Sequence, residues 1–400
     1  MKNSLLLVLL TLSLSIFSQV KSSKENKFAF DLMGKLINND SNIFFSPYSL
    51  SSALAMTYNG ANEKTKDQIE NVMHFNDDVT KSNKFFLKSN TLYNSYSSIP
   101  EFKLNIANAI WISNSIKLKC KFSKSMRKYF GAELYNEINT DKINSWADKN
   151  TNNMIKEIVS DRDIAQAKLV LTNAIYFYGE WVHKFDTTKT KEENFTTANN
   201  EVIKVPMMHQ TDKILYYDNR EFKMLRLPYE GEKIEMTLLL PQEGYTINSI
   251  LKNMNIKKFD DYYKMAQVRK LKFALPKFKI ETTYKLRDIL MDMGMSLAFT
   301  PDADFSLITK EGLFIDEVIH KAVIDISEKG TEAAAVSAVV MRTTSVNTTN
   351  FIANHPFVVI IKDTKTGNIL FFGTIVNPLG KTVKQEIKVN TKIRSIENKK

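Results

Sequence analysis

Residues 328–345 read EKGTEAAAVSAVVMRTTS, and this stretch says more about the fold than any other part of the chain. Its first half is crowded with small residues, its second half is β-branched and apolar, and it contains no proline. Alanine runs favour helix, whereas valine and threonine runs favour strand. The local preferences therefore conflict, which is expected of a segment that changes its structural state.

Alternate residues of an extended chain face opposite sides. Between Thr331 and Thr343 the chain has two charged residues, Glu332 and Arg342, and both fall in one set. The other set is uncharged and begins with small residues: Thr331, Ala333, Ala335, Ser337, Val339, Met341 and Thr343. Small inward side chains lower the steric cost of entering a packed sheet, and Gly330 just before them lets the chain turn freely. The alternative interpretation of this segment is an ordinary edge strand followed by a soluble loop that does not insert.

The residues around this stretch predict a mixed α+β molecule. Apolar residues recur with helical spacing at residues 28–36, 49–58, 63–72 and 143–158. Strand-like runs occur at residues 106–112, 169–177, 236–240, 271–280, 358–361 and 369–375. Helices dominate the first third and strands the last, and with only 12 glycines and 9 prolines the chain has no long flexible linker. We therefore expect one compact α+β body.

The two ends of the chain differ from this body. Residues 1–22 carry Lys2 and an apolar run that breaks at Gln19 and Lys21, which predicts a cleaved signal peptide and not a membrane anchor. The protein is therefore expected to be secreted and extracellular, with no membrane-spanning segment. Residues 380–400 are basic with little apolar periodicity, and we expect a mobile tail there.

The net charge of +11 is spread along the chain, with two denser patches. One is the tail, and the other comprises Lys117, Lys119, Lys121, Lys124, Arg127 and Lys128. A solvated face explains such patches, and a site for a polyanion such as a glycosaminoglycan or heparin is the alternative. We expect a monomer without a nucleic-acid partner.

Sites for covalent or metal chemistry are few in this sequence. Cys120 is the single cysteine and is expected to be a packing residue, with a reactive thiol as the alternative. Asn39, Asn194 and Asn347 begin sequons and are glycosylation candidates in a secreted chain. GxSxG and HExxH are absent, and the five histidines lack metal-ligand spacing. We therefore expect no enzyme, no metal and no required cofactor.

An ordered set of short blocks resembles the serpin family of serine protease inhibitors. Residues 328–335 resemble the hinge of inhibitory serpins. The other blocks are NIFFSP at 42–47 with Ser49, NAIYF at 173–177 with Gly179 and Trp181, VPMM at 205–208, LPKF at 275–278, HKA at 320–322, NHPF at 354–357, FFG at 371–373 and NP at 377–378. The ordered set spans residues 28–378 and is far more specific than any single block.

The resemblance implies one α+β serpin domain at residues 23–379, with about nine helices, three β-sheets and an exposed reactive-centre loop. It also implies inhibition as a suicide substrate: a serine protease forms an acyl-enzyme with the loop, and the cleaved loop then inserts into a sheet and traps the protease covalently. The native state would therefore be metastable. A non-inhibitory serpin-fold carrier, chaperone or storage protein is the alternative, although its hinge would more often be bulky, charged or proline-containing.

The resemblance also assigns site residues. The hinge comprises Glu328, Gly330, Thr331, Glu332, Ala333, Ala334 and Ala335. Ser46, Ser49, Asn173 and His320 match the polar group beneath the opening strands, and Trp181 and Lys321 match positions near the top of the sheet. Counting from the hinge puts the reactive bond at Thr344–Ser345, which suits an elastase-like target. Cleavage after Arg342 would indicate a trypsin-like target, and Met341 is a further alternative.

Overall fold

The computed structural model describes residues 25–37, 41–75, 78–96, 98–331, 350–380 and 383–385. These residues form ten α-helices and two hydrogen-bonded β-sheets, which confirms the expected α+β class. The helices are α1 Glu25–Leu36, α2 Pro47–Tyr58, α3 Glu63–Met73, α4 Val79–Tyr96, α5 Cys120–Phe130, α6 Thr140–Asn150, α7 Asp161–Ile164, α8 Ile247–Asn253, α9 Ile256–Met265 and α10 Arg287–Asp292.

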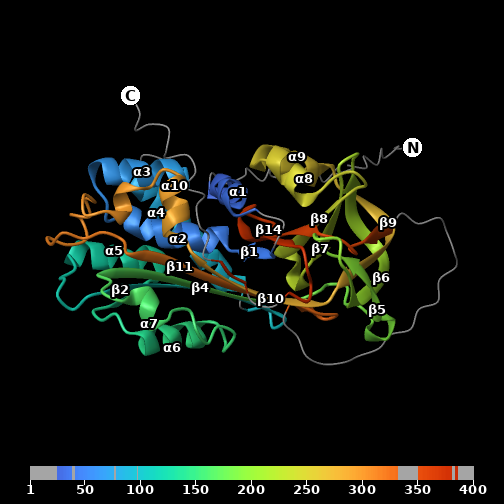
Figure 1. Ribbon diagram of the computed structural model, residues 1–400, viewed down its shortest axis with the longest axis horizontal. Helices are drawn as coiled ribbons and strands as arrows, with labels where there is room; N and C mark the ends of the chain where they lie inside the picture. Colours follow the sequence, from blue (N-terminus) through green and yellow to red (C-terminus); the bar gives the residue numbers. More distant parts are fainter. Residues whose placement is uncertain are drawn as a thin grey trace, which may run out of the picture.

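The first sheet, here called the central sheet, has seven strands in the order β16-β10-β11-β12-β4-β2-β3. Its strands are β2 Phe102–Ile112, β3 Glu133–Tyr135, β4 Leu169–Glu180, β10 Phe278–Lys285, β11 Glu317–Ile326, β12 Gly330–Thr331 and β16 Val383–Gln385. In Figure 1 its long strands run between α6 and α7 on one side and the group that includes α2 on the other.

The second sheet has nine strands. Figure 1 shows it extending from β1 and β14 near the middle of the molecule to β5, β6 and β9 at the right. Its strands are β1 Ile43–Phe45, β5 Lys191–Thr196, β6 Val202–Asp218, β7 Phe222–Pro228, β8 Ile234–Pro241, β9 Gln267–Pro276, β13 Asn350–Ile352, β14 Phe357–Asp363 and β15 Ile369–Ile375. The resemblance implied three sheets. The described strands form two, because the 17-residue strand β6 pairs with β5, β7 and β9 and joins them into one network.

Burial explains why β4 and α2 lie at the centre of the fold. The first nine residues of β4 are all buried, as expected for a strand covered on both faces. All twelve residues of α2 are buried as well, so this helix has little amphipathic character and passes through the core. On the other face of the sheet, α6 contributes Ile143, Trp146 and Ala147 to a second buried cluster with Trp111.

Two segments depart from the sequence-based expectation. The helix expected at residues 143–158 ends at Asn150, because Asn152 and Asn153 adopt positive φ angles of 52° and 63°, which a right-handed helix excludes. The tail was expected to be mobile, but Val383–Gln385 pairs in parallel with Thr282–Tyr284 of β10. The open edge of β10 supplies the backbone partners that hold this short strand, since an unpaired edge is a template for added strands.

Among the described helices, none combines the length and apolar character needed to span a membrane.

Candidate functional site

The central sheet contains one parallel contact between two long strands. Residues Glu317–Lys321 of β11 pair in parallel with Val170–Ala174 of β4, whereas β11 pairs antiparallel with β10, and β4 with β2. We call this contact the β4–β11 seam. A strand that entered the seam antiparallel to both neighbours would replace one parallel ladder by two antiparallel ladders, which are slightly more stable per residue.

The two residues of β12 already lie between β4 and β11 at one end of the seam. Thr331 pairs antiparallel with Gly179 of β4 and also with Ile326 of β11. Glycine is required just before it, because a Cβ at Gly330 would lie 2.0 Å from the carbonyl oxygen of Gly179. The sheet is thus open by one strand position at this end and closed further along.

A row of buried polar residues crosses the closed part of the seam. His320 of β11 lies opposite Asn173 of β4, and Asn173 lies opposite Asn108 of β2. The amide of Asn173 accepts from His320 Nδ1 at 3.1 Å and donates to Asn108 Oδ1 at 2.8 Å. Asn108 in turn donates to the hydroxyl of Ser52 in α2 at 3.1 Å. This polar row links three strands to the helix beneath them.

The tautomer of His320 follows from its backbone partner. The amide N–H of Ser46 donates to His320 Nε2 at 2.9 Å, so Nε2 is the unprotonated nitrogen and Nδ1 carries the proton that Asn173 accepts. Complete burial lowers the pKa of His320 to about 3. The polar row is therefore neutral and fully hydrogen-bonded at physiological pH, which is what a buried polar network requires.

The serines at the start of α2 complete the polar group. The Ser46 hydroxyl caps the helix by accepting the Ser49 amide N–H at 3.2 Å, and the Ser49 carbonyl accepts from Asn173 Nδ2 at 3.1 Å. The Ser49 hydroxyl itself is buried without a hydrogen-bond partner in the described chain. A buried hydroxyl with spare capacity can bond a new neighbour at little cost when the strands rearrange.

Trp181 holds the open end of the seam. Its backbone N–H donates to the Lys329 carbonyl at 2.7 Å, and its indole N–H donates to the Ser327 carbonyl at 3.0 Å. Its ring stacks on Tyr229 with centroids 4.5 Å apart, and the Tyr229 hydroxyl lies 2.7 Å from the Thr331 hydroxyl. Thr331, the first residue of the predicted inward set, is therefore buried, with a polar partner for its hydroxyl.

Glu328 anchors the chain just before the hinge. Its carboxylate lies 2.9 Å from the Lys277 ammonium and accepts from the Thr190 hydroxyl at 2.8 Å. Burial opposes ionisation of Glu328, but the contact with Lys277, a backbone hydrogen bond and the contact with Thr190 together outweigh it and lower the pKa of the carboxyl group. The turn that leads into Gly330 is thus tied down by a charged side chain.

Lys321 does not lie where the resemblance put it. The residue follows His320 at the closed part of the seam, away from Trp181. Because successive strand residues face opposite sides, its side chain points to the face that carries α6. There Lys321 Nζ contacts the Glu157 carbonyl at 2.5 Å and forms an ion pair with Glu281. Lys321 therefore ties β11 to the segment after α6 and to β10.

Several predicted site residues lie outside the described residues: Glu332, Ala333, Ala334, Ala335, Met341, Arg342, Thr344, Ser345, Asn39 and Asn347. Asn194 is described and is exposed on β5. Cys120, expected to be a packing residue, is exposed at the start of α5, because the buried face of that helix is formed by Phe122, Met126 and Phe130.

Sequence reasoning missed three residues of the site: Asn108, Ser52 and Tyr229. Asn108 carried a signal, because a lone asparagine inside the apolar run at residues 106–112 needs a buried partner. Ser52 and Tyr229 carried none, since their roles depend on helix and strand neighbours that are distant in sequence.

Comparisons with known proteins agree with this architecture. Residues 23–378 match the family model described as "Serpin (serine protease inhibitor)". An uncharacterized serpin-like protein of Thermococcus kodakarensis is 38% identical over 88% of this chain and 84% of its own length. The leukocyte elastase inhibitor of Xenopus tropicalis is 34% identical over 89% of this chain and 99% of its own.

Solved serpin structures superpose on most of the chain. The native state of the thermophilic serpin tengpin has a TM-score of 0.81 and 31% identity, with 88% of this chain and 93% of that chain covered. Native protease nexin-1 with heparin has a TM-score of 0.80 and 27% identity, with 89% and 98% covered. By its family model, its relatives and its fold, this chain is a member of the serpin family.

Proposed function

We propose that this serpin inhibits a serine protease by inserting its reactive-centre loop into the β4–β11 seam. The observation that carries the proposal is the position of Thr331, which already pairs with both flanking strands in the antiparallel sense that insertion requires. A strand continued from Thr331 would need no change of register, only separation of β4 from β11 further along.

The two registers agree on where each loop residue would go. Continuing the Thr331–Gly179 pair along β4 sets Ser337 opposite Asn173, and continuing the Thr331–Ile326 pair along β11 sets Ser337 opposite His320. These two residues face each other across the closed seam. The inserted Ser337 would therefore enter the polar row, and its hydroxyl could replace the hydrogen bond that His320 and Asn173 lose when they separate.

The chemistry follows from an ordinary acylation. The serine Oγ of the protease bonds to the carbonyl carbon of the reactive residue, the peptide C–N bond breaks, and the new amino group leaves with a proton. We propose Thr344–Ser345 as this bond, with cleavage after Arg342 or Met341 as alternatives. Insertion of the loop would then move the ester-linked protease away before water can complete the hydrolysis.

Incubation with a trypsin, a chymotrypsin and an elastase tests the proposal. We expect a complex that survives boiling in SDS with at least one enzyme, and the mass of the released C-terminal peptide identifies the bond. The same enzyme with its catalytic serine replaced by alanine should give no such complex. Cleavage of the loop by all three enzymes without any stable complex would instead favour a non-inhibitory carrier, chaperone or storage role.

We also propose that the protein is secreted as a monomer after removal of residues 1–22. The support is the short apolar run that breaks at Gln19 and Lys21. N-terminal sequencing of protein from the culture medium tests this. The exposed Asn194 is a glycan site in such a protein, and digestion with a glycosidase would reveal it as a loss of mass.

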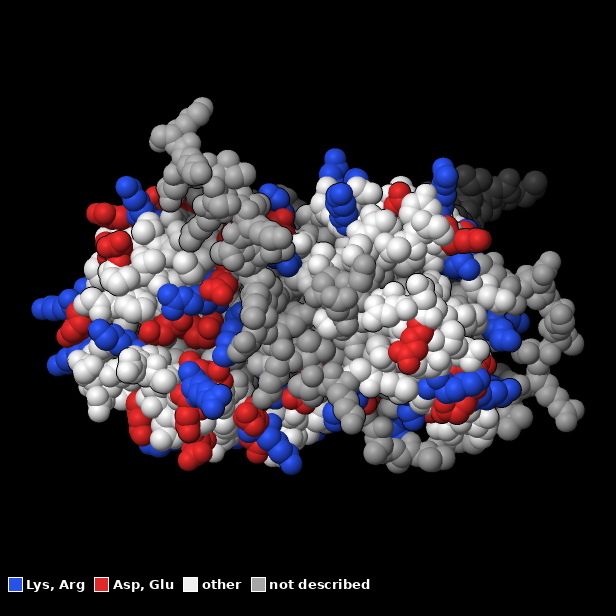
Figure 2. All heavy atoms as spheres, in the orientation of Figure 1, with Lys and Arg blue, Asp and Glu red and all other residues white. Residues whose placement is uncertain are grey.

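A polyanion site on α5 is a further proposal. Lys121, Lys124, Arg127 and Lys128 are exposed on this helix and have no acidic partner in the described chain. Elsewhere on the face drawn in Figure 2, cations and anions are interspersed. Heparin-column retention should fall for Lys121→Ala/Lys124→Ala. A variant without residues 379–400 tests the tail separately, and unchanged retention of that variant would exclude the tail.

A further inference from the structure

The end of the β4–β11 seam that lies away from the hinge is closed by a side chain. The carboxylate of Asp316, the residue just before β11, accepts the backbone N–H of Lys168 at 2.7 Å and that of Leu169 at 3.0 Å. The Asp316 N–H donates in return to the Leu169 carbonyl at 3.3 Å. Because Leu169 is the first residue of β4, these bonds join the two strands where their parallel pairing begins. We call this set of contacts the Asp316 clamp.

The clamp connects two sides of the central sheet. On one side, the Lys168 carbonyl accepts the backbone N–H of Ser113 at 3.0 Å, which ties the start of β4 to the end of β2. On the other side, the Asp316 carbonyl accepts from the guanidinium of Arg287, the first residue of α10, at 3.1 Å. Arg287 also donates to the Phe299 carbonyl at 2.9 Å. If β4 separated from β11, Lys168 would therefore move with β2, and Asp316 would stay with α10.

The carboxylate of Asp316 serves this purpose alone. It forms no ion pair with any residue that the structure describes, and both of its hydrogen bonds come from the backbone of the facing strand. An ionised acceptor forms shorter and stronger hydrogen bonds than a neutral one. The side chain therefore contributes to closure of the seam without a second structural role.

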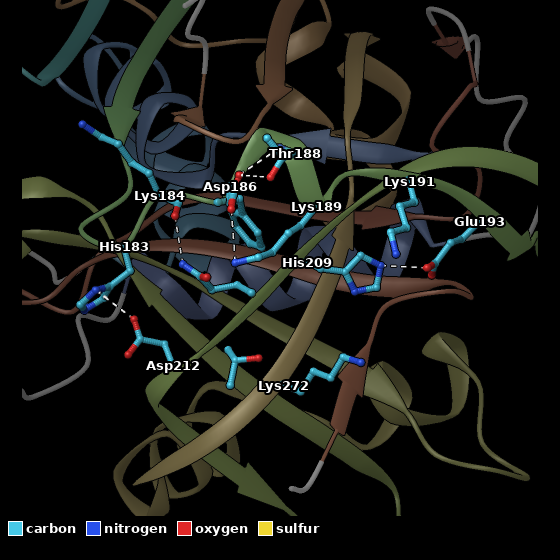
Figure 3. A pocket seen from close by; sticks show the side chains of 13 residues that line it. His183, Lys184, Asp186, Thr188, Lys189, Lys191, Glu193, His209, Asp212 and Lys272 are labelled. Carbon is cyan, nitrogen blue, oxygen red and sulfur yellow. Dashed lines mark hydrogen bonds and ion pairs between the residues drawn. The ribbon is translucent and has the colours of Figure 1, made fainter. Parts of the chain in front are cut away.

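The hinge end of the seam lacks a comparable charge. It borders a cavity of about 960 Å³ (Figure 3), because Phe185 lines the cavity and donates its backbone N–H to the Glu328 carbonyl at 2.8 Å. Counting the Glu180 carboxylate that pairs with Lys184, the acidic and basic groups around the cavity are equal in number: Glu180, Asp186, Glu193 and Asp212 against Lys184, Lys189, Lys191 and Lys272. The cavity therefore has no excess charge with which to hold the hinge end.

A loop that inserted completely would meet the clamp. Continuing the Thr331–Gly179 pair along β4 sets Met341 opposite Leu169. Continuing the pairing of Thr331 along β11 sets the same residue opposite Asp316. The inserted Met341 would thus occupy the position where the carboxylate now reaches across the seam.

The N–H of Leu169 cannot serve the clamp and an inserted strand at the same time. At the hinge end, the Trp181 N–H already donates to the Lys329 carbonyl at 2.7 Å. In an antiparallel pair every second residue donates to the same neighbouring strand, and Leu169 lies an even number of residues from Trp181. Its N–H would therefore donate to the carbonyl of Met341. Full insertion thus requires release of the clamp.

We propose that the Asp316 clamp regulates loop insertion: it stabilises the closed seam of the intact protein and must open before the loop can insert fully. This inference rests on the proposed inhibitory function, because it concerns the same insertion. The clamp stabilises only the state before insertion, since Met341 replaces it afterwards. Asp316 is therefore a positioning residue of the closed seam and does not contact the protease.

Thermal unfolding of the intact and the loop-cleaved protein measures the clamp in both states. Asp316→Ala removes both side-chain hydrogen bonds, so its intact form should melt about 3 °C below the intact wild type. Its cleaved form should melt at the same temperature as cleaved wild type, because insertion has already broken the clamp. Asp316→Asn keeps an acceptor oxygen and should recover part of the loss. Asp302→Ala, which removes an exposed carboxylate elsewhere, is the control and should change neither form.

Two outcomes of this comparison would overturn the proposal. An equal loss in the intact and cleaved forms of Asp316→Ala would show that the contact persists after insertion, or that Asp316 has a general structural role. No loss in the intact form would show that the clamp does not stabilise the closed seam.

Hydrogen exchange of the intact protein tests the clamp without a protease. In Asp316→Ala the amides of residues 317–321, at the seam, should exchange about tenfold faster, because opening of the seam no longer breaks the charge-assisted bonds. The amides of β14 and β15, far from the clamp in the sheet order, should be unchanged. Unchanged exchange at the seam would contradict the clamp. If cleavage fails to stabilise even the wild type, the proposed insertion is wrong, and the exchange data still decide whether Asp316 holds β4 and β11 together.

Discussion

His320 is held at the seam as a neutral imidazole with both nitrogens hydrogen-bonded. Its partners are the backbone amide of Ser46, the N-cap residue of α2, and the side chain of Asn173 on the facing strand β4. The closed state of the seam thus depends on an uncharged histidine, because an imidazolium would have no acceptor at Nε2 and would be buried without a counter-ion.

The first prediction concerns this histidine and pH. Burial lowers the pKa of His320 to about 3, whereas an unfolded histidine titrates near 6.5. The unfolded chain therefore takes up the proton first, and stability falls as the pH drops below about 6.5, by about 1.4 kcal/mol for each pH unit. The denaturation midpoint of His320→Gln should lose part of this acid dependence. The surface variant His183→Gln is the control, and equal acid dependence for His320→Gln and the intact protein would refute the assignment.

The second prediction concerns Thr331, which is 2% exposed and hydrogen-bonded to the Tyr229 hydroxyl. An arginine there cannot keep its charge solvated inside the seam. Thr331→Arg should therefore be cleaved as a substrate, with covalent complex reduced at least tenfold. Glu332→Arg, one residue further and in the outward set, should keep most of its activity. Equal loss in both variants, measured by SDS gels after protease treatment, would show that the parity argument is wrong.

The elements show why some boundaries could be predicted from sequence and others could not. The strands β4, β14 and β15 are long apolar runs with clear limits, and all three form where expected. The end of α6 depends on two asparagines that adopt left-handed backbone, a preference too weak to see in an apolar pattern. β16 could not be predicted, because its partner is an edge strand about 100 residues earlier in the chain.

The tail strand β16 leads to a prediction about hydrogen exchange in β10. Val383–Gln385 covers the edge of β10 at Thr282–Tyr284. Removal of residues 381–400 should expose that edge, so amide hydrogens of β10 that pair with the tail should exchange with solvent faster. Each lost hydrogen bond costs about 1 kcal/mol, which implies roughly fivefold faster exchange where opening is local. The measurement is hydrogen exchange monitored by mass spectrometry. Identical exchange of β10 in the truncated and full-length proteins would mean that the tail does not pair with β10 in solution.

The whole molecule combines a parallel seam, a hinge already paired at one end and a polar row at the other. The resemblance to serpins supplied the hinge and most of the polar group, and the alternation of charged and small residues supplied the parity. Neither of these could supply the register that brings Ser337 opposite Asn173 and His320, since register depends on the three-dimensional pairing of strands distant in sequence.

Loop insertion is tested most directly by comparing thermal unfolding of the intact protein with that of the same protein cleaved once in the loop. If the loop inserts as an antiparallel strand at the seam, the cleaved form should melt about 10 °C or more above the intact form, a gain of several kcal/mol. Thr331→Arg should show a much smaller rise after the same cleavage. A cleaved wild-type protein that melts at the same temperature as the intact one would contradict insertion.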